Sequence, residues 1–377
     1  MRDRIVTTLK TVVENEEDLK EELETCITDA SWTPPGWKNP VSTFGDFYKY
    51  LNQLLDSIPI DSTFDNLFHG LFYIVSQNGN RLQKDKKFVE FQEWLAVFVE
   101  VYGSFLNTAE SANSLYSFIH DKMFTVEDFE ITPGGFNSFN TFFCRHIKPG
   151  KRPIGTQTLP YDPPAEGNPL LPNPPEDSAL IHKNMCDDNA ITVPADSVYK
   201  GCWSIAEDST ITVSKGNKYS IKELLKGSKY ADKFNGGIFT HSYLTVFTYH
   251  RYHVPVRGTV LETKVISGKV FADVVKEENG DLSAQDGTGY QFKQDRGLMV
   301  IDSPVGLVAL LPIGMDFVSS CNFSVDEGNY VNKGDEFGYF LFGGSDMIML
   351  FERDNIDIQL PEKDKLYKLG QVFGKCK

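Results

Sequence analysis

The chain has few cysteines and no long apolar run. Its six cysteines lie far apart and form no Cys-x-x-Cys pair: Cys26, Cys144, Cys186, Cys202, Cys321 and Cys376. Thiols scattered in this way indicate reduced cysteines rather than a disulfide framework or a zinc site, so we expect no metal. No stretch approaches the ~18 apolar residues of a membrane span, and the N-terminus carries no signal-peptide core. We therefore expect a soluble, cytoplasmic protein without a stable membrane anchor.

Positive charge is also scarce. The sequence has 37 Lys and Arg against 52 Asp and Glu, a net charge of −15. This balance argues against a nucleic-acid partner and against docking on an anionic membrane. A chain of 377 residues with 41% apolar and 24% charged residues has the composition of a folded globular protein of about two domains.

Several catalytic signatures are absent. The sequence contains no Gly-x-Gly-x-x-Gly after a strand, no Gly-x-x-x-x-Gly-Lys-Ser/Thr, no His-Glu-x-x-His and no Gly-x-Ser-x-Gly. The sequence therefore gives no support for dinucleotide binding, P-loop phosphate chemistry, zinc proteolysis or α/β-hydrolase chemistry.

Up to about residue 130 the apolar residues recur at helical spacing. The stretches with this period are 12–23, 44–58, 64–77 and 88–109. They are separated by breakers such as Pro34-Pro35-Gly36 and Asn78-Gly79-Asn80, so we expect four to six helices. Residues 133–154 should form a hinge with a short aromatic helix, and the seven prolines of residues 156–190 indicate an exposed loop.

From Ala190 the period changes to two, which is typical of strands. Alternating segments occupy 190–201, 209–216, 243–266, 297–304 and 306–315. One helix is expected after Ser220, because Ser220 and Glu223 have capping-box spacing. The sequence thus predicts an α+β protein, with an all-α domain at 1–132 and a mostly β domain at 133–377.

Two histidines lie close together in the β region, His250 and His253. On a regular strand a three-residue spacing sends two side chains to opposite faces, whereas a strand end or a bulge lets them converge on one pocket. The alternative is a pair of buried histidines whose nitrogens are satisfied by backbone carbonyls.

Two further segments are candidates for chemistry. Gly343-Gly344-Ser345-Asp346 follows an apolar strand, and its glycines permit a strained turn, although an ordinary hairpin turn would use the same residues. Asp196, in Pro194-Ala195-Asp196, is an acid in a turn, a common place for aspartate.

Taken together and in this order, these segments resemble the phosphatidylserine decarboxylase family of pyruvoyl enzymes. The resemblance covers about residues 133–377. It rests on Phe136–Arg145, Arg152-Pro153, Pro194–Asp196, Lys200-Gly201, Tyr219–Leu225, Tyr249-His250-x-x-His253-x-Pro255, Glu327-Gly328, Val331–Gly338 and Phe342–Ser345.

Within this family the chain is most similar to the fungal aromatic amino-acid (L-tryptophan) decarboxylases. These also carry a long helical N-terminal region and end their catalytic domain in Phe-Gly-Gly-Ser, whereas the lipid enzymes usually have a membrane-associating N-terminal segment. One residue departs from the family pattern: Asp346 stands where Ser or Thr generally follows the reactive serine. A carboxylate at this place is expected to affect the rate of self-processing.

The resemblance implies self-processing at Ser345. Its Oγ attacks the carbonyl of Gly344, and the chain separates into a β chain of 1–344 and an α chain of 345–377, which remain partners. Ser345 becomes a covalent pyruvoyl group, which replaces pyridoxal phosphate as the carbonyl that condenses with the substrate amine. His253 is implied as the base for cleavage, Asp196 as the carboxylate that orients it, and His250 as the proton donor, an imidazole of ordinary pKa.

The implied reaction converts free L-tryptophan, a small-molecule substrate, to tryptamine and CO2. Two alternatives stay open. One is a phosphatidylserine decarboxylase that makes phosphatidylethanolamine by the same chemistry. The other is a non-catalytic binding protein on the same scaffold, which Asp346 favours.

Overall fold

The computed structural model describes most of the chain. The described residues are 2–60, 64–121, 124–131, 133–154, 185–213, 216–284, 289–314, 320–341, 345–352, 356–359 and 362–377. Most of the predicted proline-rich loop, together with Gly343 and Gly344 of the predicted cleavage site, lies outside these residues.

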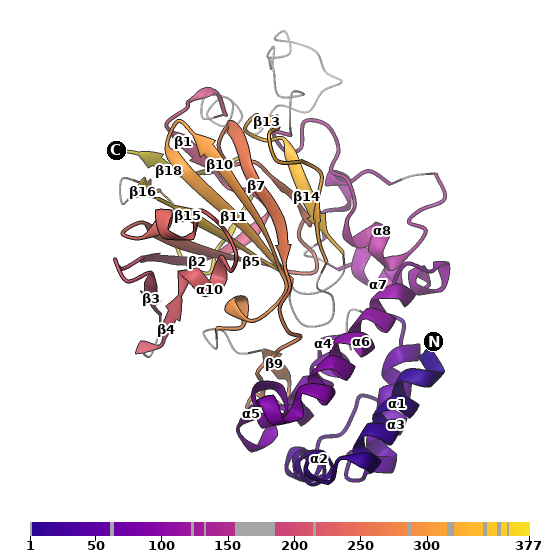
Figure 1. Ribbon diagram of the computed structural model, residues 1–377. Coiled ribbons are helices and arrows are strands. Elements are labelled where there is room, and N and C mark those ends of the chain that lie inside the picture. Colours follow the sequence, from indigo (N-terminus) through magenta and orange to yellow (C-terminus); the bar gives the residue numbers. More distant parts are fainter. Residues whose placement is uncertain are drawn as a thin grey trace.

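Helices form the N-terminal part and group on one side of the strands (Figure 1). The α-helices there are α1 (Arg2–Asn15), α2 (Glu17–Ala30), α3 (Phe44–Asp56), α4 (Phe64–Val75), α5 (Gln77–Lys84), α6 (Val89–Phe105), α7 (Leu115–Ile119) and α8 (Phe139–Phe143). Short 3₁₀ turns lie between them: η1 (Lys86–Phe88), η2 (Ala109–Ala112) and η3 (Val126–Asp128). Helix α3 shows why these segments are helical: Thr43 caps its first turn by accepting from Asp46 N–H, and Phe47, Leu51 and Leu54 bury one face.

The predicted number of helices up to residue 130 was too low. Seven α-helices lie in the described part of that region. The predicted stretch 12–23 is split at Glu16 into α1 and α2, and the short helices α5 and α7 carry too few residues to show a period. The breaker at Asn78-Gly79-Asn80 is confirmed, since all three residues have positive φ, at 51°, 71° and 62°.

Eight antiparallel strands form the main sheet in the order β13-β7-β10-β11-β15-β5-β2-β17. Their bounds are β13 (Tyr330–Val331), β7 (Gly258–Ile266), β10 (Arg296–Ser303), β11 (Gly306–Gly314), β15 (Ser345–Phe351), β5 (Ile238–Leu244), β2 (Ser197–Ser204) and β17 (Leu366–Tyr367). Strand β15 therefore lies inside the sheet, with β11 on one side and β5 on the other.

Smaller sheets complete the β region. They consist of β1 (Ala190–Thr192), β18 (Val372–Cys376) and β16 (Ile356–Ile358); of β12 (Cys321–Phe323), β14 (Glu336–Phe340) and β6 (Arg251–His253); of β3 (Thr210–Thr212) and β4 (Lys218–Ser220); and of β8 (Val274–Lys276) and β9 (Leu282–Ala284). Helix α10 (Ile221–Leu224) begins after Ser220, whose Oγ accepts from Glu223 N–H as predicted, and two 3₁₀ turns are η6 (Ala231–Phe234) and η7 (Tyr290–Phe292).

The main sheet separates two apolar clusters. Successive residues of a strand point to opposite faces. Accordingly Met347 and Met349 of β15 join the large cluster that continues into the helices, whereas Ile348 and Leu350 join a second cluster beneath α10. Ser345 and Asp346, at the start of the same strand, likewise point to opposite faces.

The α+β fold class is confirmed, with helices first and a mostly β region from residue 190. The boundary between residues 132 and 133 stays a prediction. Among the described residues, no helix combines the length and the apolar composition needed to cross a membrane.

Candidate active site

Ser345 is the first residue of β15 and is fully buried. It pairs with Gly314 of β11 and Leu244 of β5. Its Oγ has no hydrogen-bond partner among the described residues. A buried hydroxyl without a partner is costly and uncommon, which singles this atom out from ordinary core serines.

His253 lies at the end of β6, completely buried, with both ring nitrogens bonded. Nδ1 is 2.9 Å from the carbonyl oxygen of Gly334, and Nε2 is 3.1 Å from the Tyr249 hydroxyl. Because a carbonyl only accepts, Nδ1 carries the hydrogen and Nε2 is the nitrogen with the lone pair. Burial lowers the pKa of His253 to about 4, so the ring is neutral at pH 7.

His250 precedes β6 and is equally buried. Its Nδ1 bonds to the carbonyl oxygen of Thr248 at 3.0 Å, and its Nε2 has no partner among the described residues. The ring packs on Phe143 of α8, with 3.8 Å between ring centroids. Burial, and then the charge of Arg145, hold the pKa of His250 well below 6.5. The expectation of an ordinary imidazole pKa is therefore wrong for His250.

Arg145 holds the segment in front of His250. Its Nη2 donates to the carbonyl oxygens of Phe247 and Thr248, both at 2.7 Å. The guanidinium is buried against aromatic rings, and the ring centroid of Phe129 lies 4.1 Å away. Burial lowers the pKa of Arg145 to about 9, which still leaves it charged at neutral pH. Arg145 therefore holds the carbonyl of Thr248 in place, and that carbonyl in turn orients the ring of His250.

Asp196 is bound by Arg152 rather than by His253. Arg152 donates to it twice, Nε to Oδ1 at 2.9 Å and Nη2 to Oδ2 at 2.5 Å, and Leu369 N–H also donates to Oδ1 at 2.9 Å. Burial lowers the pKa of His253, and the negative charge of Asp196 raises it by a smaller amount. His253 N–H donates to the carbonyl of Pro194, which keeps the two segments adjacent.

A backbone hydrogen bond joins the segments of His253 and Asp196, but no hydrogen bond among the described residues links the predicted site residues themselves. Tyr249 and Val254, which flank the histidines, belong to the apolar cluster on the face of the sheet to which Ser345 points. In the described structure, no hydrogen bond joins His253 to Ser345 or to Asp196. Each histidine does bond a backbone carbonyl, as the alternative interpretation of a buried pair expects.

Asp346 lies on the opposite face and has its own partners. Its Oδ2 accepts from the Tyr290 hydroxyl at 2.6 Å and lies 3.0 Å from Nε2 of His241. The His241 contact lacks the alignment of a hydrogen bond, and Oδ1 has no partner among the described residues. The carboxylate is fully buried.

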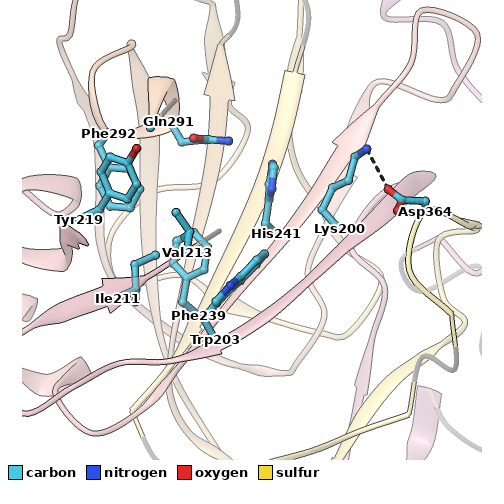
Figure 2. A pocket seen from close by; sticks show the side chains of 11 residues that line it. Lys200, Trp203, Ile211, Val213, Tyr219, Phe239, His241, Gln291, Phe292 and Asp364 are labelled. Atoms are coloured by element: carbon cyan, nitrogen blue, oxygen red, sulfur yellow. Dashed lines mark hydrogen bonds and ion pairs between the residues drawn. The ribbon is translucent and has the colours of Figure 1, made fainter. Parts of the chain in front are cut away.

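A cavity of about 210 Å³ opens on this face of the sheet (Figure 2). Its lining is mostly aromatic and apolar, with a few polar groups: Lys200, Trp203, Ile211, Val213, Tyr219, Phe239, His241, Gly289, Gln291, Phe292 and Asp364. Lys200 and Asp364 form an ion pair at 3.0 Å. Gly289 has φ of 72°, and a β-carbon there would lie 2.0 Å from the Tyr219 ring, so glycine is needed for this wall.

Sequence reasoning missed the partners of the site. The sequence indicates Arg145 and Arg152 only as parts of a resemblance, and it indicates no role for His241, Tyr249 or Tyr290. The sequence does not show that Asp196 is buried, so it carries no signal that this carboxylate needs a cation such as Arg152. Among the described residues, no group of three or more His, Cys, Asp or Glu side chains is placed to hold a metal ion.

The chain belongs to the phosphatidylserine decarboxylase family. The sequence profile of that family, described as phosphatidylserine decarboxylase, matches residues 177–375, more than half of the chain. The members named here are decarboxylases, that is carboxy-lyases.

Three relatives show the range of the family. Phosphatidylserine decarboxylase proenzyme 2 of rice is 30% identical over 68% of this chain and 36% of its own length. The decarboxylase iboD of Amanita muscaria is 28% identical over 69% of this chain and 77% of its own length. The L-tryptophan decarboxylase of Psilocybe cubensis is 29% identical over 44% of this chain and 41% of its own length. The chain thus spans about a third of the length of the rice relative.

Proposed function

We propose that the chain is a proenzyme that cleaves itself between Gly344 and Ser345 and then acts as a pyruvoyl-dependent decarboxylase of a free aromatic L-amino acid. The observation that carries this proposal is Ser345 itself. Its Oγ is buried without a partner among the described residues, at the first position of a central strand. An atom in this state suits a group that is consumed in a reaction better than a group that stabilises the fold.

The group formed from Ser345 would supply a ketone, which condenses with an amine and accepts the electrons left behind when CO2 departs. His253 is the proposed base that takes the Ser345 proton during cleavage. Its support is the neutral ring with the lone pair on Nε2. Asp196 is proposed to assist by its charge, since it favours the protonated ring without contacting it.

His250 is the proposed donor of the proton that replaces CO2 on the α-carbon. Because its ring is neutral in this structure, it must take up a proton before it donates one. The unpartnered Nε2 is the atom available for both steps. Arg145 positions the ring through Thr248.

Two observations support a free aromatic substrate, with L-tryptophan converted to tryptamine. A relative from Psilocybe cubensis is an L-tryptophan decarboxylase. The net charge of −15 disfavours an anionic lipid surface. We propose that the enzyme acts in the cytoplasm.

Phosphatidylserine is the second candidate substrate. It is favoured by the rice relative, a phosphatidylserine decarboxylase proenzyme. The same catalytic residues would serve it, because decarboxylation occurs on its serine headgroup.

Cleavage is tested by the intact mass of the purified protein. We expect two chains, 1–344 and 345–377, the smaller without a free amino terminus. Ser345→Ala should remain a single inactive chain, whereas Ser324→Ala, at an exposed serine, should be cleaved normally. A single uncut wild-type chain with activity would contradict the proposal, and one without activity would favour a non-catalytic binding protein.

The substrate is tested by two parallel assays. Tryptamine release from L-tryptophan should exceed formation of phosphatidylethanolamine in phosphatidylserine vesicles, and it should persist after removal of pyridoxal phosphate. Phenylalanine and tyrosine should be partly accepted, because apolar contact discriminates weakly among rings. Faster turnover of the lipid would reverse the choice of substrate and leave the cleavage chemistry intact.

A further inference from the structure

The hydroxyl of Tyr249 contacts the nitrogen that the proposed base needs. It lies 3.1 Å from Nε2 of His253, and both side chains are buried. Because Nδ1 of the same ring bonds to the carbonyl oxygen of Gly334, Nδ1 carries the hydrogen, and Nε2 accepts from the tyrosine O–H. The lone pair with which His253 would take a proton is therefore already engaged in this structure.

The contacts of His253 hold its ring in this arrangement. Its backbone N–H donates to the carbonyl of Pro194 at 2.8 Å, and β6 pairs with β14 at Glu336. Turning the ring would break the bond between Nδ1 and the carbonyl oxygen of Gly334, which is 2.9 Å long. Release of the lone pair therefore depends on movement of the Tyr249 hydroxyl and not on rotation of the histidine.

Tyr249 is packed on its ring as well as bonded at its hydroxyl. The ring lies at 25° to that of His253, with 5.6 Å between centroids, and Phe129 packs at 6.5 Å. Burial raises the pKa of Tyr249 well above 10. The hydroxyl therefore keeps its proton, which makes Tyr249 a poor carrier of protons between Ser345 and His253.

Ser345 is the second hydroxyl that needs the same acceptor. Its Oγ is buried and has no partner among the described residues, and Tyr249 belongs to the apolar cluster on the face to which Ser345 points. The unprotonated nitrogen of a neutral imidazole has one lone pair. The two hydroxyls therefore compete for Nε2, and in this structure Tyr249 holds it.

We propose that Tyr249 restrains self-cleavage by occupying the lone pair of His253, and that cleavage begins when this hydrogen bond opens. The O–H bond of Ser345 then breaks and its proton forms an N–H bond at Nε2 of His253. The electron pair left on Oγ forms the bond to the carbonyl carbon of Gly344. Tyr249 exchanges no atom in this step and is a positioning residue. This inference rests on the proposed function, in which His253 is the base.

The first test follows cleavage in time. Chains are made in a cell-free extract, synthesis is stopped, and the cut fraction is measured on gels. Tyr249→Phe should be cut ~2–10-fold faster than the wild type, the factor that corresponds to the net contribution of one hydrogen bond. Tyr50→Phe removes an equally buried hydroxyl, bonded to the carbonyl of Leu67 at 2.6 Å, and should be cut at the wild-type rate. Equal or slower cleavage of Tyr249→Phe would overturn the inference.

The second test grades the strength of the bond. With 3,5-difluorotyrosine at position 249 the hydroxyl is a stronger donor than that of tyrosine, so cleavage should be slower. The rates should therefore fall in the order phenylalanine, tyrosine, difluorotyrosine. A purely structural role would slow both altered chains, and a proton carrier would make the phenylalanine chain the slowest. The fluorinated chain keeps the hydroxyl, so it decides the question if Tyr249→Phe does not fold.

The outcomes separate this inference from the proposed function. If the wild type is cut and Tyr249→Phe is not cut faster, the inference fails and the proposed function stands. An uncut wild type beside a cut Tyr249→Phe would support the inference strongly. If the wild type and Tyr249→Phe both stay uncut, the inference fails together with the proposed self-cleavage.

Discussion

Arg145 offers a test of how one buried cation organises the site. Arg145→Lys keeps the positive charge but loses the planar fork that reaches the carbonyls of Phe247 and Thr248. We expect the free energy of unfolding to fall by ~1–3 kcal/mol, because the half-buried Phe247 carbonyl loses its hydrogen bond and the Thr248 carbonyl keeps only the bond from His250. Urea denaturation followed by circular dichroism measures the change.

The matched control for Arg145 is Arg257, whose side chain is 48% exposed beside Asp188. Arg257→Lys should change the free energy of unfolding much less than Arg145→Lys does, as is usual for a surface pair. An equal decrease in the free energy of unfolding in both variants would show that the buried guanidinium of Arg145 does not stabilise the protein more than a surface arginine does.

His250 and His253 should differ in the step that they serve. His253→Ala removes the lone pair proposed to take the Ser345 proton, so this variant should stay uncut. His250→Ala should be cleaved and yet release at least 100-fold less tryptamine, because the α-carbon loses its proton donor, a contribution of ~10²–10⁴ for such groups. Intact mass and product analysis report the two steps separately. The opposite pattern would exchange the two assignments.

Single site residues could be predicted from the sequence where they lie in a recognisable motif. Ser345, His250 and His253 stand in recognisable segments, and all three are buried in the structure. Their partners could not be predicted, because Gly334 and Arg145 reach the histidines from distant segments through tertiary contacts. The bond between Asp196 and Arg152 was missed for the same reason.

Among the elements, the side-chain amide of Gln83 is one of the groups that join the helices to the β region. The side chain of Gln83, in α5, donates to the carbonyl of Ala272 at 2.9 Å and accepts from its N–H at 3.0 Å. Gln83→Leu would leave the N–H of Ala272 unpaired, whereas its carbonyl would keep the hydrogen bond from the Ser76 hydroxyl, so we expect a loss of ~1–3 kcal/mol. Amide hydrogen exchange at Ala272 should accelerate as the joint opens.

Gln77 supplies the control for this joint. Its side chain donates to the carbonyl of Tyr73, within the same helical region, at 2.7 Å. Gln77→Leu should leave the exchange rate of Ala272 unchanged. Acceleration in both variants would show that the effect comes from the helix and not from the joint.

Periodicity predicted the long elements well and the short ones poorly. Helices α3 and α6 and strands β7, β10 and β11 lie where their patterns indicated. Helix α5 escaped prediction because it contains three residues with positive φ, and the division between α1 and α2 occurs within a continuous charged stretch. A local pattern also does not contain strand order, so the position of β15 between β11 and β5 could not be predicted.

For the whole molecule, the buried histidines predict how stability depends on pH. His253 has its pKa lowered from 6.5 to about 4 by burial, and that of His250 is also lowered. Between these values the unfolded chain binds protons that the folded chain does not bind, so stability falls as the pH drops from 6.5 toward 4. The slope is at most ~1.4 kcal/mol per pH unit for each histidine.

This slope can be measured on the uncut Ser345→Ala chain, which unfolds as one polypeptide. His253→Asn in that background should reduce the slope between pH 6.5 and 4, since one of the neutral rings is gone. His120→Asn, at an exposed position, should leave the slope unchanged. A slope that does not respond to His253 would contradict the assignment of a buried neutral ring.

Strand β15 lies inside the main sheet, and this position determines how long the two chains stay associated after cleavage. If the chain breaks before Ser345, the released end is the first residue of a strand paired along its whole length with β11 and β5. The same C-terminal piece contributes β17 to β2 and β18 to β1. Departure of the small chain would therefore require the sheet to open, and its rate would equal the rate of unfolding. The two chains should behave as a kinetically trapped heterodimer that survives dilution, gel filtration and dialysis, and that separates only in denaturant.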